Sequence, residues 1–354
     1  MAGAAVPTTL ILGAAAVVAL ASWAATGAVL RLLLAWQVFD EPNHRSSHKV
    51  ATPRGGGLAV VAVIALAWIA GAFIFKPVIS GFWFVAGGLA ILAVVSWLDD
   101  LRSLPAALRL AVQVLAVATA LWGTGGSLLV FRGLLPPLAD HLVVALLWLW
   151  FINLFNFMDG IDGISAVESA SVAGGLALCA LLAGLGAGYI FWSASLAAAA
   201  LGFIRWNWSP ARIFLGDVGS VSLGYLLGWL LILLAAKGYW AAALILPLYY
   251  LADASWTLCR RALKGEAVWK AHRQHFYQQA VQRGHSHAAV STRILLCNGV
   301  LVAAALLAVS GLTWPALALA CLAVAALLFM LAHQMPPGGA AGNRQENRNG
   351  GRAA

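Results

Sequence analysis

The sequence predicts an all-α, polytopic integral membrane protein, and three observations support this prediction. Hydrophobic residues make up 62% of the 354 residues, whereas charged residues make up only 9%. The mean hydropathy is +0.90. Apolar runs recur along the whole chain at about the ~20-residue length that crosses ~30 Å of hydrocarbon. Soluble domains carry about 25% charged residues, so a chain with so few charges must face lipid.

The apolar runs predict eleven membrane-spanning helices. The first thirty residues contain no Lys or Arg, so they form a first span rather than a cleavable signal peptide with a basic start. A charge-free stretch, 169–204, is too long for one span and is divided by the glycines of 184–188. The run 238–252 is short for a span. The predicted spans are 8–34, 57–75, 81–98, 107–123, 141–157, 165–184, 188–204, 219–236, 238–252, 294–310 and 314–334.

The basic residues orient this layout. Seventeen of the 21 Lys and Arg residues fall in loops on one side, which the positive-inside rule assigns to the cytoplasm. Lys76, Arg132 and Lys237 fall on the other side, and Arg31 lies near the inner end of the first span. The N-terminus is therefore expected outside and the C-terminus inside. The net charge of +9 then reflects cytoplasmic loops rather than nucleic-acid binding, for which no motif is present.

The chain is expected to form one transmembrane domain, 1–335. A basic tail, 336–354, is rich in Gly, Asn and Arg and is expected to be disordered. The four cysteines are far apart, form no Cys-x-x-Cys pair and are interpreted as packing residues. They are Cys179, Cys259, Cys297 and Cys321.

Most of the twelve acidic residues fall in the predicted cytoplasmic loops or at the ends of spans; only Asp140 lies outside, and Glu168 lies about a turn inside a span. Ionisable groups at the membrane are expensive and usually functional. Clustered carboxylates beside basic loops indicate a site for a divalent metal and a phosphate, because Mg²⁺ binds through one or two carboxylates plus substrate phosphates.

The first motif is a polar, basic loop, 40–57, that ends in Thr-Pro-Arg-Gly-Gly-Gly. Its cations and glycines suit a phosphate, and the alternative is a solvated cytoplasmic loop. The second motif is the pair Asp99 and Asp100 at the end of a span. Adjacent carboxylates repel and need a compensating cation or proton. The alternative for this pair is a polar helix terminus.

The third motif is Asn-x-x-Asn-x-x-Asp-Gly-x-Asp-Gly, which begins at Asn153. In a helix, Asn153, Asn156 and Asp159 recur every three residues and share one face, after which the glycines break the helix. Their side-chain oxygens suit a hard cation. The alternative is a polar break between two spans.

The fourth motif is Phe-Leu-Gly-Asp-Val-Gly-Ser, which begins at Phe214. Asp217, flanked by glycines at a helix N-terminus, can hold a metal near a phosphate. The alternative is an ordinary N-capping Asp.

The fifth motif lies in the long cytoplasmic segment 260–293 and contains His272, Arg273 and His275. These side chains are hydrogen-bond donors suited to phosphates and a sugar. The alternative is a solvated loop. A zinc site with His285 and His287 would lack a nearby Cys ligand.

In this order the five motifs resemble the polyprenyl-phosphate N-acetylhexosamine-1-phosphate transferases, the MraY/WecA group of glycosyltransferase family 4. The resemblance covers roughly residues 35–290. It implies a bundle around a cytoplasmic-facing cleft and Mg²⁺ as cofactor, with Mn²⁺ as a substitute. It also implies that the phosphate of a membrane lipid, undecaprenyl phosphate, attacks a UDP-N-acetyl sugar, a phospho-sugar transfer that releases UMP. We expect direct attack by the lipid phosphate rather than a phospho-enzyme intermediate. A homodimer is one of the assemblies that such a chain can form.

The resemblance also implies residue roles. Metal binding falls to Asn156 and Asp217. Catalytic roles fall to Asp99, Asp100, Asp159, His272 and His275, with either Asp99 or Asp100 as the base on the lipid phosphate. Substrate binding falls to Lys49 at the diphosphate, to Phe214, Asp162 and Gly160 around uracil, and to Asn153 and Arg273.

The histidine motif departs from the triple-His form and is similar to the WbpL-like, O-antigen-initiating branch. This departure predicts that the segment 268–280 selects the sugar, with Arg273 and His275 as donors, and that the sugar is a simple or 6-deoxy N-acetylhexosamine.

Two other readings remain. A secondary transporter would keep its ionisable groups near the bilayer midplane, whereas here they lie at one edge. A CDP-alcohol transferase would carry Asp-Gly-x-x-Ala-Arg, which is not found beside Asp159 or Asp162.

Overall fold

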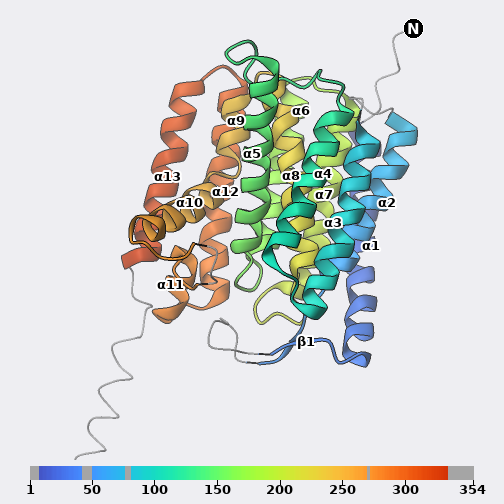
Figure 1. Ribbon diagram of the computed structural model, residues 1–354, viewed down its shortest axis with the longest axis vertical. Coiled ribbons are helices and arrows are strands. Elements are labelled where there is room, and N and C mark those ends of the chain that lie inside the picture. Colours follow the sequence, from blue (N-terminus) through green and yellow to red (C-terminus); the bar gives the residue numbers. More distant parts are fainter. Residues whose placement is uncertain (1–7, 42–49, 76–80, 269–271, 334–354) are drawn as a thin grey trace, which may run out of the picture.

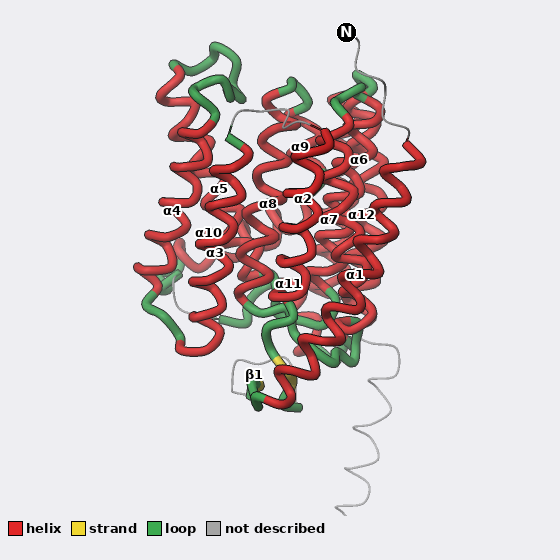
Figure 2. The backbone as a smooth tube through the Cα atoms, turned by 90° about the vertical axis from the view of Figure 1, so that its right-hand side faces the viewer, coloured by secondary structure: helices red, strands yellow, loops and turns green. Residues whose placement is uncertain are grey.

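The computed structural model describes residues 8–41, 50–75, 81–268 and 272–333. Within these residues, ten helices are long and apolar enough to cross a membrane, and they lie side by side as one bundle (Figures 1 and 2). The predicted tail 336–354 and Lys49 fall outside the described residues. The ten helices are α1 (Thr8–Ala35), α2 (Gly57–Phe75), α3 (Phe82–Arg102), α4 (Ala106–Gly123), α5 (Pro137–Phe157), α6 (Ile164–Leu182), α7 (Ala187–Asn207), α8 (Asp217–Ala236), α12 (His287–Val309) and α13 (Thr313–His333).

The predicted span 238–252 is the one that the structure corrects. Two helices replace it, α9 (Trp240–Ile245) and α10 (Leu248–Leu263), with a turn at Leu246 and Pro247. Proline lacks the N–H that a continuous helix needs and clashes with the preceding turn. Neither piece is long enough to span by itself, but together they lead the chain from the C-terminal end of α8 toward α11 (Phe276–Gln282) at the other end of the bundle (Figure 1).

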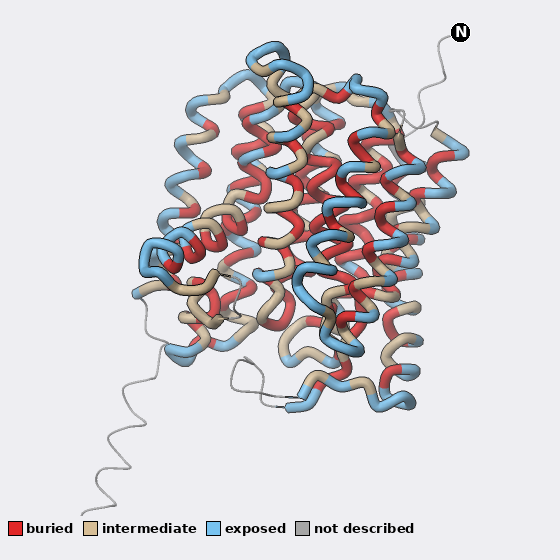
Figure 3. The backbone as a smooth tube through the Cα atoms, viewed as in Figure 1, coloured by how far each residue is buried: buried red, intermediate tan, exposed pale blue. Residues whose placement is uncertain are grey.

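Helix α8 is the centre of the bundle. Nearly all of its residues are buried, and it contacts α2, α3, α5, α6 and α9. Trp148 of α5 stacks on Tyr225 with ring centroids 4.8 Å apart, and its indole N–H donates to the Tyr225 carbonyl oxygen at 2.9 Å. Large apolar side chains such as Phe73 and Trp122 are about three-quarters exposed, as expected of a surface that lipid solvates. Buried segments, drawn in red, fill the interior of the bundle (Figure 3).

One polar contact joins two helices deep in the bundle. Asn298 of α12 donates its side-chain N–H to Oε2 of Glu168 on α6 at 2.8 Å, and both residues are fully buried. In the described part of the chain, Glu168 Oε1 and Asn298 Oδ1 have no hydrogen-bond partner. Such a pair holds α6 to α12 where no water competes for the bond.

The two ends of α8 are both bound by other segments. At its C-terminal end the Arg132 side chain donates Nε–H to the Ala236 carbonyl oxygen at 3.1 Å. Nearby, Asp140 accepts hydrogen bonds from the backbone N–H groups of Val130 and Phe131 at 3.1 and 2.8 Å. At the other end, the short strands β1 (Phe39–Asp40) and β2 (Thr52–Pro53) pair antiparallel, with Phe39 opposite Pro53. We call this second end, where α3 and α5 end and α2 and α8 begin, the site end.

Candidate active site

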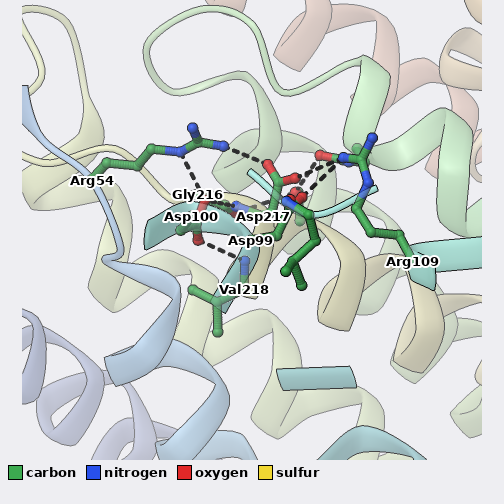
Figure 4. A network of polar contacts seen from close by, with 10 residues as sticks. Arg54, Asp99, Asp100, Arg109, Gly216, Asp217 and Val218 are labelled. Atoms are coloured by element: carbon green, nitrogen blue, oxygen red, sulfur yellow. Dashed lines mark hydrogen bonds and ion pairs between the residues drawn. The ribbon is translucent and has the colours of Figure 1, made fainter. Parts of the chain in front are cut away.

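Three carboxylates and two guanidinium groups form one network at the site end (Figure 4). Asp99 and Asp100 come from the last turn of α3, Asp217 begins α8, Arg109 lies in the first turns of α4, and Arg54 lies just before α2. Arg54 Nε is 2.8 Å from Asp100 Oδ1, and its Nη2 is 2.6 Å from Asp217 Oδ1. Arg109 Nη1 is 2.9 Å from Asp99 Oδ2 and 3.6 Å from Asp217 Oδ2. Three carboxylates against two cations leave the network one positive charge short.

Arg54 is firmly charged in this network. Burial alone would lower the pKa of its guanidinium, but the adjacent carboxylates of Asp100 and Asp217 hold that pKa above its ordinary value. The side chain is a permanent cation that bridges α3 and α8.

Asp100 binds the N-terminus of α8. Its Oδ1 accepts the backbone N–H of Asp217 at 2.9 Å and its Oδ2 accepts that of Val218 at 3.1 Å. A carboxylate in this place satisfies orphan amide groups and complements the helix dipole. Gly216 precedes the helix at φ 76°, and a Cβ there would lie 2.7 Å from Asp100 Oδ2. Only glycine fits both the backbone angle and the close approach.

Asp99 points elsewhere, as adjacent positions on a helix must, about 100° apart. Its Oδ1 accepts the backbone N–H of Leu104 at 2.6 Å, and its Oδ2 faces Arg109. Asp99 also lines a cavity that Asp100 does not reach. The two carboxylates therefore have different partners among the described residues: Asp100 pairs with Arg54 and Asp99 with Arg109.

The first and fourth motifs are held together by backbone hydrogen bonds. The N–H of Phe214 donates to the Pro53 carbonyl oxygen at 2.8 Å, and the N–H groups of Gly55 and Gly56 donate to the Phe214 carbonyl oxygen at 3.2 and 2.8 Å. Gly57 donates to the Leu215 carbonyl oxygen at 2.8 Å. These bonds fix Arg54 beside Asp217.

The cavity has a volume of about 200 Å³ and lies between α3, α4, α5 and α8. Asn153 donates to Gln113 Oε1 at 2.7 Å, and Asn156 Oδ1 accepts the hydroxyl of Ser220 at 2.8 Å. The cavity is therefore lined by both polar and apolar side chains. The polar ones are Ser96, Asp99, Arg109, Gln113, Asn153, Asn156 and Asp217, and the apolar ones include Leu92, Val95, Leu110, Val112, Phe157 and Val221.

Asp159 does not share the helix face of Asn153 and Asn156, so that expectation is wrong. Helix α5 ends at Phe157, because the chain turns into the following glycine-rich segment. Burial raises the pKa of Asp159 to about 7, against the opposing effect of a hydrogen bond from Ser165. Asp159 is thus poised to change charge near neutral pH.

Asp162 and Gly160 are engaged within the protein. Asp162 Oδ2 accepts the backbone N–H of Ala211 at 3.2 Å, and its Oδ1 is 3.2 Å from Nδ1 of His287. Burial opposes ionisation, but these hydrogen bonds hold the pKa of Asp162 below its ordinary value. Gly160 packs against the hydroxyl of Tyr277, so a Cβ has no room there. These contacts position the segment that follows α5, and the structure gives neither residue a contact that identifies a uracil pocket.

The histidine motif is organised by a carboxylate that sequence analysis did not assign. Asp253 of α10 is fully buried and accepts hydrogen bonds from His275 Nδ1 at 3.1 Å and from the N–H groups of Phe276 and Tyr277 at 3.1 and 3.4 Å. His275 is only 1% exposed. His275 thus binds Asp253 through Nδ1 at the start of α11, and its donation to the sugar stays a prediction.

His272 is the more accessible histidine. Its ring lies 4.9 Å from that of His275, centroid to centroid. Burial and the neighbouring His275 lower the pKa of His272 to about 4, so it is a neutral donor or acceptor at pH 7. Arg273, also partly exposed, accepts a hydrogen bond at its carbonyl oxygen from Gln282 at 2.8 Å.

Tyr277 joins this segment to the site. Its hydroxyl donates to the Phe157 carbonyl oxygen at 3.1 Å, directly beside the segment that carries Asp159. The third and fifth motifs are therefore in contact through α11, as the second and fourth are through Asp100.

Sequence analysis missed Arg109, Gln113 and Asp253 as site residues. Arg109 is a lone cation near the start of an apolar run, and Asp253 is a lone carboxylate directly after one. Both residues could have been predicted as functional, because isolated ionisable groups in apolar surroundings usually have a function.

The donor set suits Mg²⁺. Among the described residues, no group of three His, Cys, Asp or Glu side chains is arranged to hold a metal. Mg²⁺ does not need one, since it binds through one or two carboxylates together with water and phosphate oxygens. Asp217 and Asn156 place oxygens on one wall of the cavity, beside a network that is short of positive charge.

Comparison with known proteins identifies a similar group. Residues 82–235 match the family model described as Glycosyl transferase family 4. The Glycosyl transferase family 4 match spans the second, third and fourth motifs, which supply the carboxylate network and the cavity. The histidine motif lies beyond it.

Individual relatives extend the similarity over most of the chain. The chain is 28% identical over 304 residues to a probable undecaprenyl-phosphate N-acetylglucosaminyl 1-phosphate transferase of Bacillus subtilis, with 82% of each chain covered. It is also 28% identical to a decaprenyl-phosphate N-acetylglucosaminephosphotransferase of Mycolicibacterium smegmatis, with 80% of this chain and 78% of that protein covered. A phospho-N-acetylmuramoyl-pentapeptide-transferase of Acinetobacter baylyi is 27% identical over 54% of this chain and 62% of its own length. The predicted resemblance to the MraY/WecA group is confirmed, while the WbpL-like branch is not resolved.

Proposed function

We propose that this protein is a polyprenyl-phosphate N-acetylhexosamine-1-phosphate transferase. It transfers N-acetylglucosamine-1-phosphate from UDP-N-acetylglucosamine to undecaprenyl phosphate and thereby initiates a cell-envelope polysaccharide. One observation carries the proposal: a carboxylate–arginine network at one end of a membrane bundle borders a cavity that is lined by both polar and apolar side chains. Such a cavity suits a phosphate attached to a hydrocarbon chain, and the names of the relatives point to the same reaction.

The reaction needs positioning and charge neutralisation more than covalent chemistry by the protein. An oxygen of the lipid phosphate forms a bond to the β-phosphorus of the UDP-sugar, and the bond from that phosphorus to UMP breaks. Asp99 is the better candidate to act on the lipid phosphate, because it lines the cavity while Asp100 holds the N-terminus of α8. Arg54 positions Asp100 and Asp217 relative to each other.

Asp217 and Asn156 are proposed to hold Mg²⁺. When bound, the ion supplies positive charge to the diphosphate of the donor. Asn156 is oriented for this role by the hydroxyl of Ser220, and Asp217 by its place at the start of α8.

Sugar choice is proposed to lie in His272 and Arg273, since His275 is buried. N-acetylglucosamine is the first candidate, because the relatives from Bacillus subtilis and Mycolicibacterium smegmatis are named for it. The 6-deoxy N-acetylhexosamines and a role in O-antigen initiation, both suggested by the incomplete histidine motif, are the alternatives to be tested beside it.

The site end is proposed to face the cytoplasm. Arg132 and Lys237 lie at the opposite end of α8, whereas Arg54, Arg102, Arg109, Arg260 and Lys264 lie at or toward the site end. The positive-inside rule orients such a bundle with its basic end inward, where UDP-sugars are made.

The test is an assay of UMP release by the purified protein in lipid nanodiscs with Mg²⁺, undecaprenyl phosphate and a panel of UDP-N-acetyl sugars. We expect release that requires both the lipid phosphate and UDP-N-acetylglucosamine, and that falls sharply in Asp99→Asn. No release with any sugar, together with solute uptake into proteoliposomes, would replace the proposal with a transporter.

A further inference from the structure

Arg109 presents unused hydrogen-bond donors to the cavity. Its side chain is 40% exposed, and only Nη1 contacts carboxylates, at 2.9 Å from Asp99 and 3.6 Å from Asp217. Its Nε and Nη2 have no hydrogen-bond partner within the described ranges. Arg54 differs, because both its Nε and its Nη2 are already bound to carboxylates.

The place of Arg109 on α4 connects the cavity with lipid. Arg109 and Gln113 are one helical turn apart and both line the cavity. The preceding residue, Leu108, does not line the cavity and is 47% exposed. Arg109 therefore lies at the edge of the cavity, one residue away from an exposed apolar side chain.

A ligand for this edge must be anionic at one end and apolar beyond it. A guanidinium group binds phosphate through two parallel N–H donors, which is the arrangement that Nε and Nη2 offer. Apolar side chains line the same cavity, among them Leu92, Leu110 and Phe157, and they suit the first part of a hydrocarbon chain. UDP-sugars lack such a chain, so the acceptor fits this edge better than the donor does.

We propose that Arg109 binds the phosphate of the polyprenyl-phosphate acceptor. The inference rests on the proposed function and adds to it the residue that recognises the lipid headgroup. Without the acceptor, Arg109 neutralises Asp99 and part of Asp217; with it, the unused edge of the guanidinium holds the phosphate beside Asp99. The same cation thus reduces the repulsion between the acceptor phosphate and the carboxylate that acts on it.

The test compares Arg109→Gln and Arg109→Lys with a matched control, Arg102→Ala, in nanodiscs. Arg102 is exposed at the end of α3 and does not line the cavity. We expect Arg109→Gln to raise the KM for undecaprenyl phosphate by about 10- to 100-fold, the range for losing hydrogen bonds between charged groups. The KM for UDP-N-acetylglucosamine should change by less than about 3-fold, a difference below one such hydrogen bond. Arg109→Lys should fall between, and Arg102→Ala should match the wild type.

A binding measurement separates recognition of the headgroup from a structural role. Undecaprenol, which lacks the phosphate, is titrated against undecaprenyl phosphate; we expect the wild-type protein to prefer the phosphate and Arg109→Gln to lose most of that preference. An unchanged preference with a lower kcat would overturn the inference and leave Arg109 as a neutralising partner of Asp99. A selective rise in the KM for the UDP-sugar would assign Arg109 to the donor and also overturn it. The preference for the phosphate is measurable without turnover, so a wild-type protein that releases no UMP defeats the proposed function but not this test.

Discussion

Replacing Asp253 with Asn should loosen α11 without unfolding the bundle. Oδ1 of Asp253 accepts from His275 Nδ1, the Phe276 N–H and the Thr257 hydroxyl, and Oδ2 accepts from the Tyr277 N–H and the Tyr249 hydroxyl. Asn keeps one acceptor oxygen, which can serve the Oδ1 side. Its amide N–H₂ then faces the Tyr277 N–H and the Tyr249 hydroxyl; the hydroxyl can rotate to accept from the amide, but the buried Tyr277 N–H loses its acceptor.

The expected magnitude follows from that single lost acceptor. An unsatisfied buried donor costs about 1–3 kcal/mol, which corresponds to about a 5- to 150-fold change in an equilibrium constant. The site is fully buried, so water cannot replace the lost hydrogen bond. Helix α11 has only seven residues and depends on such contacts with other segments, since short helices are marginal by themselves.

Hydrogen–deuterium exchange of residues 276–282 is the appropriate assay, because it reports the opening of α11 alone. Exchange should accelerate by that factor in Asp253→Asn and remain near the wild-type rate in Glu266→Gln. Glu266 is the matched carboxylate: it makes a partly exposed ion pair with Arg261 in the same region. Equal exchange in both variants would refute the assignment of Asp253 as the group that holds α11.

Four further outcomes are expected. Asp217→Asn should lower kcat by about 10²-fold or more, the usual effect of removing a key electrostatic group, and a chelator should abolish wild-type turnover. Glu168→Gln should leave thermal stability nearly unchanged, because its amide can still bond to the partner on α12, whereas Glu168→Leu should lower stability by about 1–3 kcal/mol. His272 has a folded pKa of about 4, below its unfolded value, so the stability of its segment should fall as pH drops from about 6.5 toward 4, and His272→Gln should remove that dependence in exchange measurements. With the native cysteines replaced, Arg132→Cys should react with an impermeant thiol reagent in intact cells and Lys264→Cys should not.

Each of these has a contrary result. Full activity in the presence of a chelator would contradict the proposed requirement for a metal ion. A stability loss in Glu168→Gln as large as in Glu168→Leu would show that the carboxyl proton or charge matters in itself. An unchanged pH profile in His272→Gln would assign the dependence to another group, and reversed labelling would invert the topology.

The helices were largely predictable because the membrane imposes one length and one composition on each span. The run 57–75 is predicted with the same bounds as α2, and the other long helices differ by up to about four residues at their ends, except α12, which begins at His287 rather than at 294. The failure at 238–252 has a local cause that hydropathy does not register: Pro247 interrupts the helix in the middle of an apolar run.

The sequence predicted the site residues that stand together in a motif. It did not predict those that reach the site only because two helices pack against each other. The Asp99–Asp100 pair and Asp217 stand out because carboxylates are rare in this chain. That Arg109 turns toward them depends on how α4 packs on α3, and a linear pattern does not contain that angle. His272 and His275 are the same residue type three positions apart, and only the position of Asp253 decides which of them is buried.

The pairing of the segment before α2 with the segment before α8 has a consequence for biogenesis. Arg54 and Asp217 are 163 positions apart, so the ribosome has released Arg54, Asp99, Asp100 and Arg109 long before Asp217 is made. Until α8 is inserted, Asp100 can pair with Arg54 and Asp99 with Arg109, but Asp100 has no helix end to bind and Phe214 is not yet there to hold the segment of Arg54. Insertion of α8 thus completes the centre of the bundle and the site in one step.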